Sequence, residues 1–292
     1  MTYKSLKSGS IYALFVLPTL LFFAMVNVVP FIQAVIYSFQ DWNGISTNIR
    51  WVGLENYASL LSDTRFLSSS WLTVKFVAVS TILVNLLGLI LALTLNVALK
   101  TRTLLRTLFF MPQVIGSLII GFIWQFIFVQ VFEQLGDATK WPLFEMNWLS
   151  MPNYAFAAII LVYVWQSAGY FMVIYLAALQ GIPNDIIESA SIDGANWWRK
   201  TWFIVFPLIR PAMTICIFLA ISGAFKMFDL NLSLTRGGPF NSTELLPLHI
   251  YQVAFFNNNY TLGTTKAVVF FLILVTITLI QVGMMKRREV EM

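Results

Sequence analysis

Residues 76–99 read FVAVSTILVNLLGLILALTLNVAL, an uninterrupted apolar run between Lys75 and Lys100. A bilayer core about 30 Å thick requires about 20 apolar residues of α-helix. The run is longer than this and contains no Asp, Glu, Lys or Arg. It therefore predicts a membrane-spanning helix, and equivalent runs elsewhere in the chain decide the fold class.

Five further apolar runs of similar length lie on either side of this one and are separated by short charged segments. The first run is preceded by Lys4 and Lys7, but it exceeds the apolar core of a signal peptide, so it is predicted to be retained as a span. The sequence thus predicts an all-α polytopic membrane protein with six transmembrane helices in one transmembrane domain, residues 1–292. The predicted spans are about 11–39, 76–99, 107–131, 154–180, 203–230 and 265–285.

The overall composition favours the same fold class. Apolar residues make up 59% of the chain and charged residues 11%, whereas charged residues make up about 25% of a typical soluble domain. One cysteine, Cys216, permits no internal disulfide, and no Cys or His cluster has the spacing of a metal site. His249 is the one histidine and is expected to be solvated in an outer loop.

The distribution of lysine and arginine predicts the orientation. Cytoplasmic loops carry an excess of these residues. Eleven of the 18 lie on the side that holds both termini, which is therefore predicted to be cytoplasmic, and at most seven lie on the other side. The cations fall in short groups between apolar runs, a pattern that suits a membrane-orientation signal better than a nucleic-acid-binding face. The eleven are Lys4, Lys7, Lys100, Arg102, Arg106, Arg199, Lys200, Arg210, Lys286, Arg287 and Arg288.

The connection after the fourth predicted span, residues 181–200, reads GIPNDIIESASIDGANWWRK. Pro183 ends the preceding helix, and Asn184 or Asp185 can cap a new one. Gly194 permits a left-handed backbone that ends this short helix. A hairpin of two short helices over about 184–202 is expected on the cytoplasmic face. On physical grounds it is either an interfacial helix pair that places its Trp residues among lipid headgroups or a docking element for a cytoplasmic partner.

Two motifs resemble a known family. Residues 188–195, ESASIDGA, with residues 206–211, FPLIRP, resemble the EAA loop of binding-protein-dependent ABC importers; Ser189 and Phe206 replace the more usual Ala and Leu. Residues 228–243, FDLNLSLTRGGPFNST, are similar to a segment of the sugar-uptake branch, especially MalF-like maltose permease subunits. The opening segment from Leu17 to Phe39 also fits that branch.

The resemblance implies an ATP-driven mechanism. In this family two permease chains form one pathway, two cytoplasmic ATPases drive it, and an extracytoplasmic solute-binding protein delivers the substrate. The chain itself has no phosphate-binding loop, so ATP and Mg would be bound by the partner ATPases, and no cofactor or enzymatic activity is expected in this chain. The family's ATPase-coupling residues correspond to Glu188, Ala190, Asp193, Gly194 and Ala195.

The same resemblance implies a substrate pathway through the fourth and fifth spans. Its residues would be Gln166, Ser167, Tyr170, Ala220, Gly223, Ala224 and Met227. The alternative for Gln166 and Ser167 is that they bond a neighbouring helix. Lys226 and Asp229 are three residues apart and are expected to form a structural or gating ion pair.

The resulting hypothesis is a permease subunit that imports a sugar, with an oligosaccharide as the favoured substrate, in a bacterial or archaeal plasma membrane. The alternatives are an importer of glycerol phosphate or another polyol-like solute, and an ATP-independent secondary transporter or channel. Ion coupling would require ionisable residues at the middle of the membrane, and the predicted spans carry almost none there. The exact solute is not encoded in these motifs.

Overall fold

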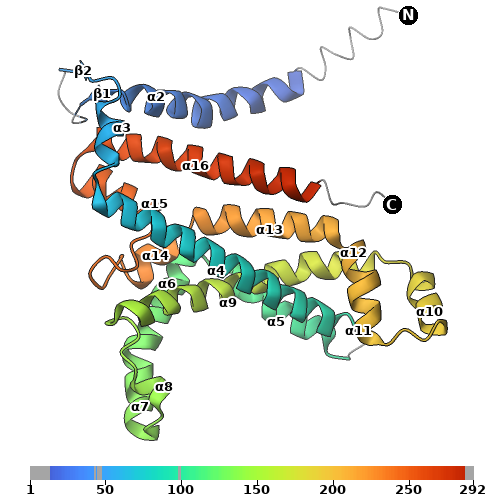
Figure 1. The fold of residues 1–292 in the computed structure, drawn as a ribbon. Helices are drawn as coiled ribbons and strands as arrows, with labels where there is room; N and C mark the ends of the chain where they lie inside the picture. Colours follow the sequence, from blue (N-terminus) through green and yellow to red (C-terminus); the bar gives the residue numbers. More distant parts are fainter. Residues whose placement is uncertain (1–13, 43, 45–47, 98–99, 287–292) are drawn as a thin grey trace, which may run out of the picture. The chain divides into compact units, whose positions relative to one another are not determined.

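A computed structural model describes residues 14–42, 44, 48–97 and 100–286. Residues 11–13 of the first predicted span and residues 98–99 of the second lie outside the described residues. So do Lys4, Lys7, Arg287 and Arg288 of the orientation argument. The chain is mainly helical (Figure 1), and its contacts divide it into two compact units where one domain was predicted. Unit 1 consists of Met1–Thr64 and Ile250–Phe271, and unit 2 consists of Arg65–His249 and Leu272–Met292.

Unit 1 contains an apolar helix from Leu14 to Tyr37, within which residues 24–28 form a π-helical turn. A two-stranded antiparallel sheet pairs Gln40 with Trp51. An ion pair joins the buried Lys266 Nζ to Oδ2 of the half-buried Asp63 at 2.6 Å. The elements of unit 1 are η1 (Ala24–Val28), α2 (Val29–Tyr37), β1 (Gln40–Asp41), β2 (Arg50–Trp51), α3 (Glu55–Leu60), η4 (Gln252–Phe256) and the first part of α16 (Tyr260–Lys286).

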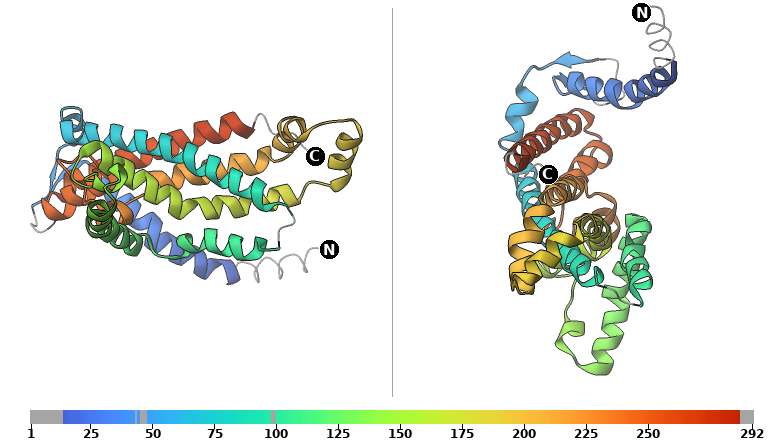
Figure 2. Two further views of the ribbon diagram at one scale, coloured as in Figure 1. Left: turned by 90° about the horizontal axis from the view of Figure 1, so that it is seen from below. Right: turned by 90° about the vertical axis from the view of Figure 1, so that its right-hand side faces the viewer.

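Unit 2 holds the remaining apolar helices and the short elements between them (Figure 2). Its long helices are α4 (Thr64–Leu95), α5 (Arg102–Val114), α6 (Ser117–Phe126), α9 (Pro152–Gln180) and α13 (Arg210–Phe225). Its short elements are η2 (Ile127–Val131), α7 (Phe132–Thr139), α8 (Pro142–Glu145), α10 (Asn184–Ile192), α11 (Trp197–Lys200), η3 (Thr201–Val205), α12 (Phe206–Leu208), α14 (Asp229–Leu234) and the start of α15 (Leu246–Tyr251).

Two of the predicted spans are broken helices. Residues 115–116 separate α5 from α6, and the backbone is extended at these two residues. Helices α12 and α13 meet at Ile209 with a bend of 70°. Proline removes a backbone donor and disfavours helical geometry in the preceding residue, so Pro207 and Pro211 on either side of Ile209 account for this bend. In the described chain five helices are long and apolar enough to cross a membrane, or six if the bent pair counts as one.

Helix α9 is the core of unit 2 and packs against α5, α13 and α14. Gly169 on α9 lies against the backbone of Phe109 on α5, where a Cβ atom would clash with the Phe109 carbonyl. Helices that approach this closely require a small residue at the contact, as membrane helices commonly have. The contact fixes the position of α9 and therefore of the polar side chains that it carries.

Candidate functional site

The α10–α11 hairpin is closed by a backbone motif around Gly194. The Ala195 N–H donates to the Ala190 carbonyl at 3.0 Å, and the Gly194 N–H donates to the Ser191 carbonyl at 3.2 Å. Gly194 has a φ of +78°, the left-handed conformation that ends helices in this type of cap. The glycine therefore makes the turn expected from the sequence.

Side-chain bonds stabilise the second half of the hairpin. The Asn196 side chain caps α11 by accepting the Arg199 N–H at 2.9 Å, and Lys200 Nζ donates to Ser191 Oγ at 3.1 Å. Helix α10 has no such side-chain cap: its N-cap residue is Pro183, so the expectation that Asn184 or Asp185 caps it is wrong. Both short helices are thus held by bonds within residues 183–200.

The hairpin exposes both charged and large apolar side chains. Glu188, Asp193 and Gly194 are exposed, whereas Ala190 is buried and Ala195 is half-buried. The five coupling residues expected from the sequence thus lie on one hairpin, with the charges outward and Ala190 inward. Large apolar side chains are exposed beside them: Ile192, Trp197, Trp198, Trp202 and Phe203.

A cavity of about 150 Å³ lies within unit 2, among α6, α9, α13 and the start of α14. It is lined partly by polar groups, whereas the helices around it are apolar. Among its lining residues, Gln166, Gly223 and Met227 were expected on the substrate pathway. The complete lining is Ser117, Tyr163, Gln166, Gly223, Lys226, Met227, Phe228, Asp229 and Leu230.

Gln166 connects this cavity to the break between α5 and α6. Its Nε2 donates to the Ile115 carbonyl at 3.2 Å and to Ser117 Oγ at 3.1 Å. The extended backbone at 115–116 leaves the Ile115 carbonyl without its helical partner, and the amide supplies a donor. The residue thus bonds a neighbouring helix and also lines the cavity.

The other four pathway residues are not among those that line the cavity. Ala220 and Ala224 are buried in α13, and Ser167 is buried in α9. The ring of Tyr170 packs edge-on against Phe171, with centroids 5.4 Å apart. These four positions lie on the expected helices but outside the cavity lining.

Lys226 and Asp229 both line the cavity, yet the described structure contains no ion pair between them within 4.0 Å. Helix α13 ends at Phe225 and α14 begins at Asp229. The i,i+3 pairing expected from the sequence requires a continuous helix, so the break separates the two groups. Both side chains are exposed and open to the cavity.

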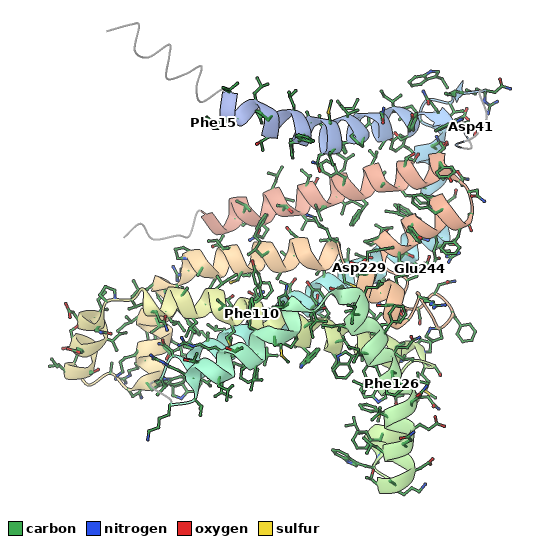
Figure 3. All side chains as sticks on the ribbon, turned by 180° about the vertical axis from the view of Figure 1, so that it is seen from behind. Phe15, Asp41, Phe110, Phe126, Asp229 and Glu244 are labelled. Atoms are coloured by element: carbon green, nitrogen blue, oxygen red, sulfur yellow. The ribbon has the colours of Figure 1, made fainter. Side chains whose placement is uncertain are left out.

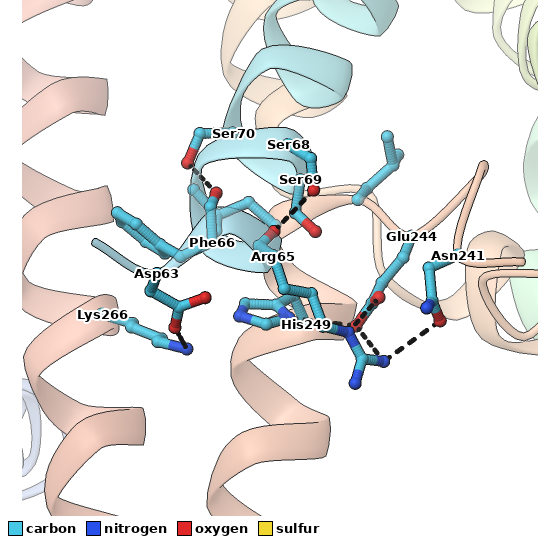
Figure 4. A network of polar contacts seen from close by, with 12 residues as sticks. Asp63, Arg65, Phe66, Ser68, Ser69, Ser70, Asn241, Glu244, His249 and Lys266 are labelled. Carbon is cyan, nitrogen blue, oxygen red and sulfur yellow. Dashed lines mark hydrogen bonds and ion pairs between the residues drawn. The ribbon is translucent and has the colours of Figure 1, made fainter. Parts of the chain in front are cut away.

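A buried polar network lies in unit 2 at the loop between α14 and α15 (Figure 4). The buried Glu244 carboxylate accepts from Arg65 Nε at 2.9 Å and lies 3.1 Å from His249 Nδ1. Burial alone would raise the pKa of Glu244, but hydrogen bonds and charges from His249 and Arg65 outweigh it and hold this pKa below its usual value. His249 is 1% exposed, so the expectation that it is solvated is wrong.

The loop itself folds around the buried side chain of Asn231. Its Nδ2 donates to the Thr243 carbonyl at 2.8 Å, and its Oδ1 accepts the Leu245 N–H at 3.1 Å. Gly237 has a φ of +84°, a left-handed conformation that glycine adopts readily, and a cis Gly238–Pro239 bond follows it. Residues 235–245 are therefore an ordered segment and not an open connection.

Apolar helices that surround a small polar cavity are typical of multi-pass membrane transport proteins. Residues 84–289 match the family described as "Binding-protein-dependent transport system inner membrane component". The chain belongs to this family, as the resemblance in its sequence motifs predicted.

Relatives match over almost the whole chain. A protein from Thermoanaerobacterium thermosulfurigenes named "Probable starch degradation products transport system permease protein AmyD" is 45% identical, over 99% of this chain and 98% of the relative. An "sn-glycerol-3-phosphate transport system permease protein UgpA" from Agrobacterium fabrum is 31% identical over 85% of both chains.

A solved structure shares the fold. It is described as "Crystal structure of bacterial alginate ABC transporter in complex with alginate pentasaccharide-bound periplasmic protein". The match has a TM-score of 0.84 at 20% sequence identity and covers 98% of this chain and 97% of the other. The match over nearly the full length shows that the two chains share one fold.

Proposed function

We propose that this chain is a permease subunit of an ATP-driven importer that moves a neutral oligosaccharide into the cytoplasm. The observation that carries the substrate class is the 45% identity, over nearly the full length, to a permease named for starch degradation products. The cavity agrees with a neutral solute, because its one cation, Lys226, is accompanied by one carboxylate, Asp229.

The proposed assembly contains a second homologous permease, two ABC ATPase subunits that bind ATP and Mg, and an extracytoplasmic solute-binding protein. The excess of Lys and Arg orients both termini and the α10–α11 hairpin toward the cytoplasm. This side is where the ATPases have access to the hairpin. The bacterial alginate transporter, crystallised with a saccharide-bound periplasmic protein, supports the expectation of such a delivery protein.

The coupling role is proposed for Glu188, Ala190, Asp193, Gly194 and Ala195. Because the hairpin is closed by its own backbone hydrogen bonds, it would move as one rigid body when an ATPase displaces it. The bend of 70° between α12 and α13 lies after the hairpin in the sequence. Closure of the ATPases would move this body and change the tilt of α9 and α13. Those two helices carry Gln166 and Gly223, so the movement would reach the cavity.

Uptake by the reconstituted importer tests the proposal. Proteoliposomes with both permeases and the ATPases should accumulate labelled maltotetraose only when ATP and the binding protein are supplied. The change Gly194→Val should lower this uptake about tenfold, because a side chain in a left-handed backbone costs about 1–2 kcal/mol. No atom lies within 4 Å of a Cβ at this position, so the strain is confined to the turn.

Ser189→Ala is the matched control, since the Ser189 side chain is exposed and its hydroxyl donates to the Ile186 carbonyl within the hairpin. Its uptake and its ATPase co-purification should equal those of the wild type. Normal uptake and normal ATPase binding in Gly194→Val would contradict the coupling role. Accumulation of the sugar without ATP would contradict the importer itself.

A glycerol phosphate importer is the second candidate, because a relative named for this solute is 31% identical. A phosphate carries about two negative charges near neutral pH, whereas the one cation of the cavity lining, Lys226, is offset by the carboxylate of Asp229. Glycerol phosphate is therefore expected neither to accumulate in the same proteoliposomes nor to compete with maltotetraose. Its accumulation in place of the sugar would select this candidate.

A further inference from the structure

A second cavity, of about 310 Å³, lies in unit 2 on the segment that joins α6 to α9. Helix α6 continues through η2 into α7, and α8 folds back beside α7 (Figure 3). None of the coupling or pathway residues lines this cavity. Its size is at the lower end of the range of about 300–1,000 Å³ for small-molecule sites. The lining residues are Phe128, Val129, Glu133, Gly136, Asp137, Phe144, Glu145, Met146, Asn147, Trp148, Leu149 and Ser150.

One wall of the cavity is aromatic. The rings of Phe128 and Trp148 are stacked, with centroids 5.3 Å apart and an interplanar angle of 27°. Phe132 contacts the edges of both Trp148 and Phe144, with centroids 6.3 Å and 5.0 Å away. The Trp148 Nε1–H donates to the Leu143 carbonyl at 3.0 Å, so the orientation of the indole is fixed from within the hairpin.

The backbone of the hairpin explains why these rings meet. Gly136 is buried, and a Cβ there would be 3.1 Å from the Phe144 carbonyl, so the residue lets α7 and α8 approach closely. Lys140 adopts a left-handed conformation with a φ of 53°, and Pro142 starts α8. These residues produce the reversal that brings Phe144 and Trp148 back against Phe128 and Phe132.

The lining is also rich in hydrogen-bond acceptors. Glu133, Asp137, Glu145 and Asn147 are exposed and line the cavity. Within the described part of the chain the one ion pair in this group joins Asp137 to Lys140 at 3.8 Å, and both side chains are highly exposed. Exposed pairs of this kind contribute little, so the carboxylates remain available to a ligand.

We propose that this cavity binds a neutral saccharide, as a receiving site separate from the cavity at α13 and α14. The C–H face of a sugar ring carries partial positive charge and stacks on the negative face of an aromatic ring. Sugar hydroxyls are donors, and carboxylate and amide oxygens accept them. Three carboxylates repel phosphates and uronates. The site therefore deepens the proposed function by selecting uncharged sugars.

The position of the cavity suits a receiving role. Ser117 at the start of α6 lines the smaller cavity, and Phe128 in η2 lines this one. The two residues lie on one continuous helix and are about 16 Å apart along it at 1.5 Å per residue. A saccharide that leaves the aromatic wall would therefore move about 16 Å along this helix to reach the smaller cavity, which Gln166 lines.

A local probe at Trp148 tests the proposal in the assembled importer. The permease is labelled with 5-fluorotryptophan, the complex is placed in nanodiscs without the binding protein, and fluorine NMR spectra are recorded during titration with maltotetraose. The Trp148 resonance, assigned by its loss in Trp148→Phe, should shift. The Trp141 resonance should stay constant, because Trp141 packs on Phe144 but does not line the cavity.

Two comparisons define the chemistry. Glu145→Gln should weaken maltotetraose binding at Trp148 about fivefold, because a charged acceptor becomes a neutral one, whereas Gln134→Ala, on α7 outside the lining, should leave it unchanged. A tetramer of uronic acid should not shift the resonance, and Glu133→Gln with Glu145→Gln should reduce this discrimination.

The outcomes separate this site from the proposed function. A constant Trp148 resonance at saturating maltotetraose, together with normal sugar uptake, would overturn the site and leave the importer intact. A resonance that shifts only when the binding protein is added without sugar would identify the cavity as a protein-docking surface and also overturn it. Failure of wild-type uptake would instead remove the proposed function.

Discussion

The α10–α11 hairpin and the cavity at α13 and α14 are built in opposite ways. The hairpin is one continuous segment, and its turn depends on backbone hydrogen bonds that the N–H groups of residues 193–195 donate to the carbonyls of residues 189–191. The cavity collects side chains from α6, α9, α13 and α14, from Ser117 to Leu230. A local turn tolerates changes in the distant packing of helices, whereas a cavity between helices does not. The two regions should therefore respond differently to substitution.

The largest difference is expected from Gly169→Val. A side chain at this position collides with the Phe109 carbonyl, and overpacking of a tight contact costs about 3 kcal/mol. This corresponds to a fall in melting temperature of about 6–12 °C, measured by intrinsic fluorescence of the purified complex. Gly194→Val, whose strain of about 1–2 kcal/mol is confined to a local turn, should melt closer to the wild type than Gly169→Val does.

Gly283→Ala is the control for this experiment, because a Cβ at Gly283 has no neighbour within 4 Å. Its melting temperature should match that of the wild type. If Gly194→Val melted as early as Gly169→Val, the hairpin would not be an independent local element.

An intermediate effect is expected from Glu244→Gln, which breaks a tertiary network in the same unit. Removal of one partner of a fully buried pair costs about 3–5 kcal/mol, but Arg65 is 43% exposed, so about 2 kcal/mol is expected. Thermal unfolding of the variant at pH 7 measures it. A change below the error of the measurement would show that the network contributes nothing to stability.

The pH dependence of the melting temperature tests the contribution of Glu244 to stability independently. Its pKa is lower in the folded than in the unfolded chain, where the ordinary value is 4.5. Its contribution to stability is therefore present above about pH 4.5 and is lost as the pH falls through the lower, folded pKa. Wild-type melting temperatures between pH 6 and pH 3 should show this loss. Glu244→Gln should show less of it, and identical slopes would contradict the shift.

The smallest effect separates two pathway residues on α9. Gln166→Ala removes two hydrogen bonds at the cavity and should raise the KM for maltotetraose uptake about fivefold, which corresponds to about 1 kcal/mol. Tyr170→Phe should leave the KM unchanged, because Tyr170 is outside the cavity lining. The sequence resemblance placed both residues on the pathway, so an equal effect of the two would favour that prediction over the cavity.

Much of the fold and the turn of the α10–α11 hairpin were predictable from the sequence, whereas the N-cap residue of α10 was not. The length of an apolar run indicates a span, Pro183 fixes its own φ angle, and Gly194 permits the left-handed conformation that the turn requires. The bounds were less predictable: α4 begins at Thr64, before the charged Lys75 that was used to delimit the second span. A helix can continue through a charged residue where that residue lies outside the apolar core of the membrane. The local sequence does not show where the helix leaves this core.

The cavity was only partly predictable. Gln166, Gly223 and Met227 were placed by family resemblance, whereas Tyr163 and Ser117 were missed as lining residues. The best available signal for them was polar residues within apolar runs. That signal does not say which face of a helix each residue occupies relative to its neighbours.

The sequence by itself determined the class of fold, the approximate spans and the α10–α11 turn, because each follows from the length of an apolar segment or from the backbone preference of one residue. Only the tertiary structure decided that His249 is buried against Glu244 and that Lys226 and Asp229 face a cavity without pairing. Burial and pairing depend on which helices meet and where they break. Those are properties of packing between residues far apart in the chain, and no segment encodes them alone.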